Sequence, residues 1–365
     1  MAFQFNFSIE NTDESRLGAL EDERPQRELK QESLTLSDKQ EGLAGNRNDP
    51  SSGEDTFNQE LLSERPVQVA DHSSLNRHHD ITLPEMFSCP APSKAHDVPK
   101  DVCKVLENKV VETLPGHMNI YVVKAELTNY SHGDSILTKS ISSHSDLITG
   151  VYEGGLKIWE CTFDLIDYFS EAEVQFANKV VLDLGCGSGL LGITALKGNA
   201  EMVHFQDYNG VVIEETTLPN ILVNCICRNG DSGGITGSSL EQCQERDFDH
   251  DLISKCKFFS GEWSGFRHLL LNSGSPLTKY DLIITSETIY NPDYYDALHE
   301  TLSELLKANG CIYLASKAHY FGCGGGVMLF AEFVKKKGVF SSRTVKIVDK
   351  GLKRFIIELV FKNPS

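Results

Sequence analysis

The stretch that decides the fold is residues 179–192, which read Lys-Val-Val-Leu-Asp-Leu-Gly-Cys-Gly-Ser-Gly-Leu-Leu-Gly. The apolar run 180–182 is typical of a strand that is buried on both faces. Three glycines, Gly185, Gly187 and Gly189, end this strand before the helix-forming residues 190–197. Because glycine accepts a positive φ and has no Cβ, a ligand can lie against the backbone there, facing the N–H groups of the helix N-terminus. The stretch predicts a strand, a ligand-binding turn and a helix.

Two cofactors compete for this turn. The string from Gly187 to Gly192 fits the dinucleotide pattern G-x-G-x-x-G, which indicates a nicotinamide or flavin cofactor. Asp183, however, precedes the first glycine by two residues, and a carboxylate there repels a pyrophosphate and attracts an ammonium. The spacing of Asp183 and the glycines also resembles motif I of the seven-strand methyltransferases, whose cofactor is S-adenosyl-L-methionine. We favour S-adenosylmethionine, with a dinucleotide or an unliganded turn as the alternatives.

Composition limits the classes of partner. The chain has 365 residues and a formal net charge of −18, which argues against direct binding to nucleic acid and favours a basic protein partner. It contains neither 18 consecutive apolar residues nor a signal-peptide pattern, so we expect no membrane contact and a location in the cytosol or nucleus. Ten cysteines without zinc spacing indicate reduced thiols and no metal site.

The chain divides into three predicted regions. Residues 1–100 are rich in charged and polar side chains and lack Tyr and Trp, so we predict a disordered acidic tail. Residues 101–178 are expected to form an N-terminal cover, with a helix over 102–111, a strand over 119–127 and a cofactor-facing helix over 158–169. Residues 179–365 are the predicted core, with a Gly/Ser-rich insertion at 229–251.

The core pattern predicts an α/β fold. Strands are expected at 180–182, 202–207, 280–285 and 311–316, and 256–263 is expected to form the third strand with its exit turn. Helices are expected at 190–197, 211–224, from 292 onward and at 327–337. A short turn over 349–352 joins two further strands, 345–348 and 355–361, as an antiparallel hairpin. Five alternating strands that end in such a hairpin are typical of the Rossmann-like, seven-strand sheet of S-adenosylmethionine-dependent methyltransferases. A dinucleotide fold would need a second mononucleotide-binding half.

Three side chains at predicted strand ends suit this chemistry. Asp207 ends the second strand, where a carboxylate grips a ribose diol, although it could instead cap the next helix. Trp263 follows the third strand and has a face suited to stacking on adenine, or to packing in the core. Glu287 follows the fourth strand, beside the glycine turn, and is a candidate catalytic carboxylate or a helix cap.

A more specific resemblance begins at Glu287 and Tyr290. Their spacing resembles the (Asp/Glu)-x-x-(Tyr/Phe) motif of the methyltransferase-like family that modifies proteins. Together with the segments 154–160, 183–189, 205–209, 260–263 and 318–326, it makes residues 100–365 resemble the histidine protein methyltransferases. The resemblance implies methyl transfer to the tele nitrogen (Nε2) of a histidine in the basic ribosomal protein L three of the large subunit, with effects on ribosome biogenesis or translation. It also implies a cytosolic and nuclear location, including the nucleolus, and we expect a monomer.

The resemblance also implies a set of site residues. Gly185, with the other motif I residues Asp183, Gly187 and Gly189, should hold the methionine part of the cofactor. Gln206, Asp207 and Tyr208 should meet the ribose and adenine. The remaining cofactor contacts should come from Ile158, Trp159, Glu160, Cys161, Thr162, Gly261, Glu262, Trp263 and Ser286.

For the chemical step, we expect Glu287 to accept a hydrogen bond from Nδ1–H of the acceptor imidazole, so that Nε2 presents its lone pair. Tyr290 and Asn291 should orient the ring. Two alternatives stay open on the sequence: a lysine methyltransferase of the same family, and a non-catalytic protein that binds the cofactor and chaperones a ribosomal partner.

Overall fold

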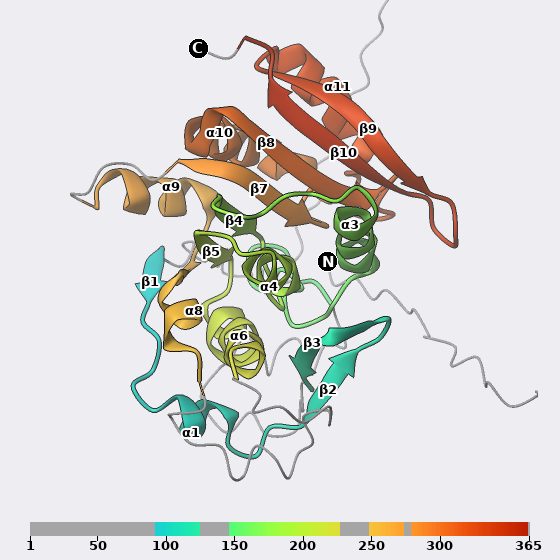
Figure 1. Cartoon of the computed structure of the whole chain (residues 1–365). Coiled ribbons are helices and arrows are strands. Elements are labelled where there is room, and N and C mark those ends of the chain that lie inside the picture. The colour runs from blue at the N-terminus through green and yellow to red at the C-terminus, as the bar shows by residue number, and fades with distance from the viewer. Residues whose placement is uncertain (1–91, 125–145, 227–247, 274–278, 364–365) are drawn as a thin grey trace, which may run out of the picture. The chain divides into compact units, whose positions relative to one another are not determined.

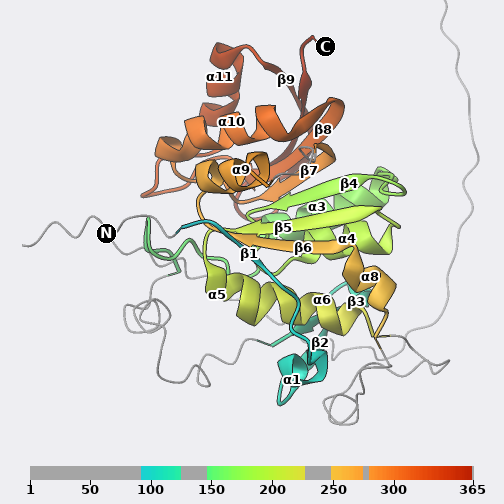
Figure 2. The same ribbon diagram turned by 90° about the vertical axis from the view of Figure 1, so that its left-hand side faces the viewer.

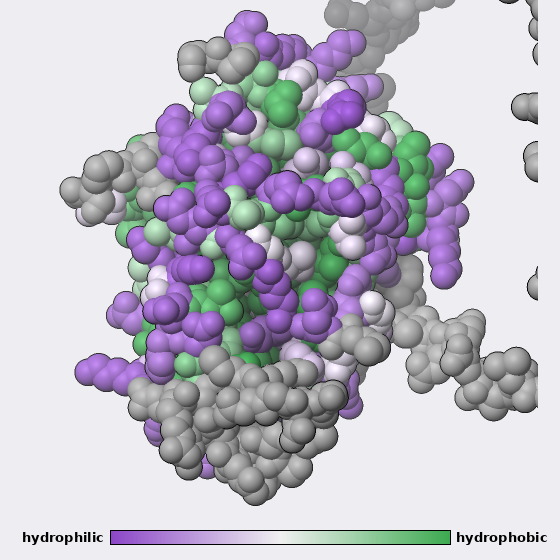
Figure 3. Space-filling model, in the orientation of Figure 1, coloured by the Kyte–Doolittle hydropathy of each residue, from purple (hydrophilic) through white to green (hydrophobic). Residues whose placement is uncertain are grey.

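The computed structural model describes residues 92–124, 146–226, 248–273 and 279–363. The predicted tail before residue 92 and most of the predicted insertion 229–251 lie outside these ranges. The described residues form an α/β fold around one large sheet (Figure 1). In this part of the chain no helix is long and apolar enough to cross a membrane. Hydrophilic side chains cover most of the face shown in Figure 3, with hydrophobic ones in small groups.

The sheet has eight strands in the order β1-β6-β5-β4-β7-β8-β10-β9. Five of them are parallel: β4 (Val180–Leu184), β5 (Met202–Asp207), β6 (Cys256–Ser260), β7 (Tyr280–Ser286) and β8 (Leu306–Lys317). The hairpin of β9 (Phe340–Val348) and β10 (Arg354–Phe361) joins antiparallel to β8. The predicted fold is therefore confirmed. Because successive strands run to opposite sides of β4, ligands are expected at its carboxyl end.

The eighth strand, β1 (Lys94–His96), corrects the predicted boundary of the tail. It pairs antiparallel with β6 at the edge of the sheet, so ordered chain begins ahead of the expected start near Val102. Polar contacts hold it there: the His96 ring nitrogen Nε2 lies 2.8 Å from the Ser260 hydroxyl. A short polar strand at a sheet edge has no hydrophobic alternation, so the sequence carried no signal for it.

Helices cover both faces of the sheet (Figure 2). Strand residues alternate between two hydrophobic clusters: Val181 packs with the helices of one face and Leu182 with those of the other, and both are fully buried. This two-sided burial explains the apolar run in β4. On one face lie α3 (Glu160–Glu171), α4 (Leu190–Lys197) and α6 (Leu218–Asn224), and on the other α9 (Trp263–Leu271), α10 (Tyr295–Leu305) and α11 (Val327–Lys337).

The N-terminal cover consists of α1 (Val102–Leu106) and the hairpin of β2 (Val111–Leu114) and β3 (His117–Val123). The prediction of a helix through 111 was wrong, because Asn108 adopts a left-handed φ of 59° that ends helical geometry. The hairpin packs on α6, whose Asn220 Oδ1 accepts a hydrogen bond of 2.7 Å from the Val123 N–H.

Three further elements differ in detail from the predictions. The helix expected over 211–224 is present, but it contains a π-helical turn, η1 (Ile213–Thr217), between α5 (Gly210–Val212) and α6. The third strand ends at Ser260, and Trp263, expected in its exit turn, begins α9. The short helix α8 (His250–Ser254) precedes β6, and the 3₁₀ turn η3 (Pro292–Tyr294) precedes α10.

Candidate active site

A cavity of about 310 Å³ opens at the carboxyl ends of β4, β5, β6 and β7, where the strand order reverses. It brings together many of the predicted site residues from distant parts of the chain. Those in its lining are Trp159, Thr162, Gly185, Gly187, Asp207, Tyr208, Gly261, Glu262, Trp263, Ser286, Glu287 and Tyr290. Gly154, Gly155 and Cys186, from the motif segments, also line the cavity. The rest of the lining was not identified from the sequence: Gly150, Glu153, Lys157, Ser188, Thr288, Tyr294 and Ala297.

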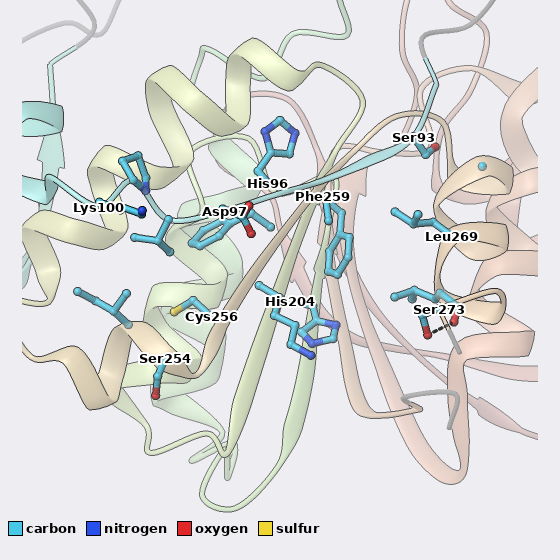
Figure 4. Close-up of a pocket in the computed structure, with 18 of the residues that line it drawn as sticks. Ser93, His96, Asp97, Lys100, His204, Ser254, Cys256, Phe259, Leu269 and Ser273 are labelled. Carbon is cyan, nitrogen blue, oxygen red and sulfur yellow. Dashed lines mark hydrogen bonds between the residues drawn. The ribbon is translucent and has the colours of Figure 1, made fainter. Parts of the chain in front are cut away.

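A larger cavity of about 1020 Å³ lies elsewhere, along the edge of the sheet between β1, α8 and α9 (Figure 4). His204 and Phe259 are among the side chains drawn in it. The His204 ring is buried, which lowers its pKa to about 3, and Nδ1 lies 2.7 Å from the Tyr280 hydroxyl. Since neither the glycine turn nor any other predicted site residue lines this cavity, we place the active site in the smaller one.

The glycine turn forms a bare backbone cradle. Gly185 and Gly187 have φ values of 66° and 50°, which few other residues adopt. A Cβ on Gly185 would lie 2.6 Å from Thr288, and one on Gly187 would lie 3.2 Å from the carbonyl oxygen of Gly155. Any larger residue would therefore fill the space between the turn and the opposite loop. The cradle fits a flat polar ligand held by backbone groups.

Side chains of the neighbouring helix hold the turn in place. The Thr217 hydroxyl, at the end of the π-helical turn, donates a hydrogen bond of 2.6 Å to the Gly187 carbonyl oxygen. Asn220 Nδ2 donates another, of 2.9 Å, to the Ser188 carbonyl oxygen. Gly189 lies outside the cavity lining and occupies the N-cap position of α4, with φ 75°. Its contact with the cofactor stays a prediction.

Asp207 is the carboxylate best placed to grip a ribose. Its Oδ2 accepts a hydrogen bond of 2.9 Å from the Gly187 N–H, and its Oδ1 accepts one of 3.1 Å from the Asn209 N–H. Burial raises its pKa to about 6, although these backbone donors oppose the rise. Asp207 thereby joins the end of β5 to the glycine turn and keeps lone pairs available for a diol.

Asp183 and Gln206 lie behind this surface, outside the lining. Asp183 is 1% exposed, and its Oδ2 accepts a hydrogen bond of 2.8 Å from the Gly192 N–H in α4. Its Oδ1 has no hydrogen-bond partner among the described residues, and its contact with the cofactor ammonium stays a prediction. The Gln206 side-chain amide donates to the carbonyl oxygens of Gly261 (2.8 Å) and Asp207 (3.0 Å), which fixes two turns together, and its contact with the ribose or adenine stays a prediction.

The end of the cavity at which adenine is expected is aromatic. Tyr208 donates a hydrogen bond of 3.0 Å to the Gly150 carbonyl oxygen, which leaves its ring in the lining. The Trp263 ring packs edge-on to Tyr294, with 6.4 Å between ring centroids. Gly261 turns with a φ of 118°, and its N–H donates to the Asp207 carbonyl oxygen at 3.0 Å. These contacts leave two ring surfaces and one glycine turn around a flat ligand.

Only some of the residues at the start of α3 that were predicted to contact the cofactor line the cavity. Trp159 donates from its indole N–H to the Gly154 carbonyl oxygen at 3.1 Å, and the hydroxyls of Thr162 and Ser286 lie 3.2 Å apart. These three side chains line the cavity. Ile158, Glu160 and Cys161 lie outside this lining, and their contacts with the cofactor stay predictions. Glu160 and Cys161 begin α3, and the Cys161 side chain is fully buried in the core.

Glu287 follows β7 in a left-handed conformation, with φ 59°, and its side chain is buried. Its Oε1 lies 3.3 Å from Nζ of the buried Lys317, and its Oε2 accepts a hydrogen bond from the Tyr320 hydroxyl. Lys317 also lies 3.2 Å from Glu160 Oε2. Burial would lower the pKa of the Lys317 ammonium, but Glu287 and Glu160 outweigh it and raise that pKa. Sequence reasoning missed Lys317 and Tyr320, although β8 and the loop after it end on the same side of the sheet as β7.

Glu153 is the second carboxylate at this end of the site. It accepts hydrogen bonds from the Gly150 N–H at 2.6 Å, the Tyr294 hydroxyl at 3.2 Å and the Tyr290 hydroxyl. Burial raises the pKa of the Glu153 carboxyl, and these donors only partly oppose the rise. Asn291 is outside the lining: its Oδ1 accepts from the Asp293 N–H at 3.0 Å and caps η3, and its contact with the imidazole stays a prediction.

A small chamber of about 30 Å³ adjoins the main cavity and shares its residues Glu153, Trp159, Glu287 and Tyr290. Its other walls are Leu147, Tyr320 and Cys323. Aromatic rings and two carboxylates thus surround a pocket next to the glycine cradle. Such a pocket suits a flat acceptor ring that gains positive charge during the reaction.

Comparison with known proteins identifies the family. Two family models match parts of the chain: ribosomal protein L11 methyltransferase over residues 165–247 and lysine methyltransferase over residues 266–321. The histidine protein methyltransferase 1 homolog of Rattus norvegicus is 50% identical over 100% of both chains. The homolog of Dictyostelium discoideum is 40% identical over 60% of this chain and 61% of its own. EEF1A lysine methyltransferase 3 of Mus musculus is 26% identical over 44% of this chain and 55% of its own.

Full-length identity to a histidine enzyme outweighs the partial match to lysine enzymes, and motif I and the cradle are intact. The dinucleotide, lysine and non-catalytic alternatives are therefore set aside. The chain belongs to the histidine protein methyltransferases, enzymes that use S-adenosylmethionine to methylate histidine side chains of proteins.

Proposed function

We propose that this enzyme methylates the tele nitrogen (Nε2) of a histidine in ribosomal protein L three of the large subunit, and so affects ribosome biogenesis or translation. Histidine as the acceptor residue is supported chiefly by the chamber beside the glycine cradle, because its aromatic walls and two carboxylates fit an imidazole. The substrate part is supported by charge: a net charge of −18 favours a basic ribosomal protein over nucleic acid as partner.

The proposed reaction requires mainly that the donor methyl group and the acceptor nitrogen are aligned. Bound S-adenosylmethionine supplies the activated methyl group, and the chain's own residues position donor and acceptor in a site shielded from water. An imidazole, with a pKa of about 6.5, is largely neutral at pH 7, whereas deprotonating a lysine costs about 4–5 kcal/mol there. The chamber holds no free amine base among the described residues, since Lys317 is committed to Glu287 and Glu160. That arrangement favours histidine as the acceptor.

The remaining parts of the proposal concern partners and location. We propose that the enzyme acts as a monomer, without direct contact with nucleic acid or membrane. We also propose a location in the cytosol and nucleus, including the nucleolus, the compartments through which such a substrate passes before assembly. The acidic composition is compatible with recognition of a basic protein before it joins ribosomal RNA.

The substrate is tested by incubating the purified protein with tritiated S-adenosylmethionine and the separated proteins of the large ribosomal subunit. We expect label in protein L three, and peptide mass spectrometry with comparison to synthetic standards should place it on Nε2 of one histidine. The variant Asp207→Ala serves as the control that lacks cofactor. Label in a different protein would overturn the substrate, and label on a lysine would overturn the acceptor chemistry.

Affinity for the cofactor should depend on pH through Asp207. Its pKa in the folded protein is raised to about 6, so its carboxylate becomes protonated well above the pH at which a free aspartate does. A protonated carboxyl accepts fewer hydrogen bonds from a diol, so affinity should fall as pH drops below about 6, by up to about tenfold per pH unit. Calorimetry between pH 5 and 7 measures this, because the cofactor's own groups do not titrate there. The variant Asp207→Asn should bind weakly with no such slope, and a flat wild-type profile would contradict the ribose assignment.

A further inference from the structure

Two carboxylates, Glu153 and Glu287, border the chamber that would receive the acceptor imidazole. Only one of them can take the hydrogen bond from Nδ1–H of that ring. The sequence assigned this role to Glu287, from its place after β7. The contacts of the two carboxylates distinguish them, and the inference below rests on histidine being the acceptor.

The charge of Glu287 is already balanced inside the protein. Lys317 Nζ lies 3.3 Å from its Oε1, and the Tyr320 hydroxyl donates to its Oε2. Both partners are buried, so this arrangement stays fixed through the reaction. A carboxylate that is paired with a cation gives little further stabilisation to a second positive charge beside it. Glu287 therefore serves to hold Tyr320 at the chamber wall, while Lys317 lies outside the lining.

Glu153 has a different set of partners. Neutral donors hold it, namely the hydroxyls of Tyr290 and Tyr294 and the Gly150 N–H, and no ion pair among the described residues includes it. Two of these donors use Oε1 and one uses Oε2. Since a carboxylate has about four lone-pair sites, one site on Oε2 is left for a further donor. Glu153 thus carries an uncompensated charge at the edge of both cavities.

We propose that Glu153 accepts the hydrogen bond from Nδ1–H of the acceptor histidine and takes that proton when the methyl group has been transferred. The Nε2 lone pair forms the new N–C bond, and the C–S bond breaks with its electrons going to sulfur. The ring, now cationic, gives its Nδ1 proton to Glu153, and the products are neutral tele-methylhistidine and a carboxylic acid that later loses the proton to water. Burial, which raises the pKa of Glu153, suits it to this transfer.

The proposal also accounts for the acceptor. A negative charge fixed beside the acceptor would hold a lysine in its protonated form, which has no lone pair for the methyl group. An imidazole instead uses one nitrogen as the donor to Glu153 and the other as the nucleophile. The other titratable groups around Glu153 are Asp207, Tyr208, Glu287, Tyr290, Tyr294 and Cys323. Lys157 also lines the main cavity, but its ammonium pairs with Asp146 Oδ2, at 3.2 Å, instead of with Glu153.

The test compares Glu153→Gln and Glu287→Gln with the wild type, on the ribosomal protein that the wild type methylates. For Glu153→Gln we expect cofactor affinity within about twofold of wild type by calorimetry and kcat lower by about 10²-fold. The acidic limb of kcat should also move by about one pH unit toward lower pH, because the lost carboxylate no longer raises the pKa of the bound histidine. A purely structural role for Glu153 would lower kcat without moving that limb.

Three outcomes decide the proposal. Unchanged kcat in Glu153→Gln overturns it, and so does a shifted acidic limb in Glu287→Gln with none in Glu153→Gln. Glu171→Gln, an exposed carboxylate at the far end of α3, is the matched control and should keep wild-type kinetics. If Glu153→Gln fails to bind the cofactor, Glu153→Asp keeps the charge on a shorter side chain, and activity at or below that of the Gln variant overturns the proposal. Failure of the wild type to label any histidine would instead refute the proposed function.

Discussion

Replacing Asp207 with alanine should weaken S-adenosylmethionine binding by roughly 10²- to 10⁴-fold, the largest effect on binding that we expect from a single site. Two losses combine. The ribose diol loses two charge-assisted hydrogen bonds, and the Gly187 N–H loses the partner, at 2.9 Å, that fixes the glycine turn. Isothermal titration calorimetry measures the dissociation constant directly.

Two comparisons make the Asp207 result specific. Asp251→Ala removes an exposed carboxylate from α8 and should leave the affinity unchanged. Thermal unfolding of the apoprotein shows whether the Asp207 variant is still folded. A folded Asp207→Ala protein with wild-type affinity would remove Asp207 from the cofactor site and would put the ribose elsewhere in the cavity.

Replacing Lys317 with methionine should cause the largest loss of stability. Lys317 is 3% exposed and lies between Glu287 and Glu160, at 3.3 and 3.2 Å, so its removal leaves the buried Glu287 without a cation. Breaking a buried pair in this way costs about 3–5 kcal/mol, which lowers Tm by about 10 °C in a domain of this size. Differential scanning calorimetry of the apoprotein provides the measurement.

The double variant tests the stated cause. If the cost comes from the unpaired carboxylate, Lys317→Met combined with Glu287→Gln should recover part of the lost stability. Lys346→Met, which breaks the ion pair of an exposed Glu171, is the comparison and should change Tm by less than about 2 °C. Equal losses in the two single variants would contradict a buried, coupled cluster at Glu287.

Much of the fold could be predicted because short-range sequence patterns indicate its strands and turns. The apolar run in β4 indicated two covered faces, and Val181 and Leu182 do pack in different clusters. The glycine spacing indicated a ligand turn, and the turn over 349–352 indicated the final hairpin. The strand β1 escaped prediction because polar contacts with β6, 160 residues away, and not hydrophobic alternation, hold it.

Side-chain direction limited the prediction of the site. A motif marks a backbone segment, but alternate residues of a strand and successive residues of a helix point to different sides. Asp207 therefore lines the cavity whereas its neighbour Gln206 fixes the turn behind it. In the same way Trp159 lines the cavity whereas Cys161 enters the core.

Local sequence spacing predicted seven strands of the sheet and the glycine cradle, and identity along the whole chain assigned the family. Only the tertiary structure showed that Glu153 meets Tyr290 and Tyr294, and that Lys317 balances Glu287. These partners lie 30 to about 140 residues apart. The ends of β7 and β8 meet the loop before α3 only in the folded chain. The distances formed there decide that Glu287 is paired with a cation and Glu153 is not, and no local sequence pattern encodes these distances.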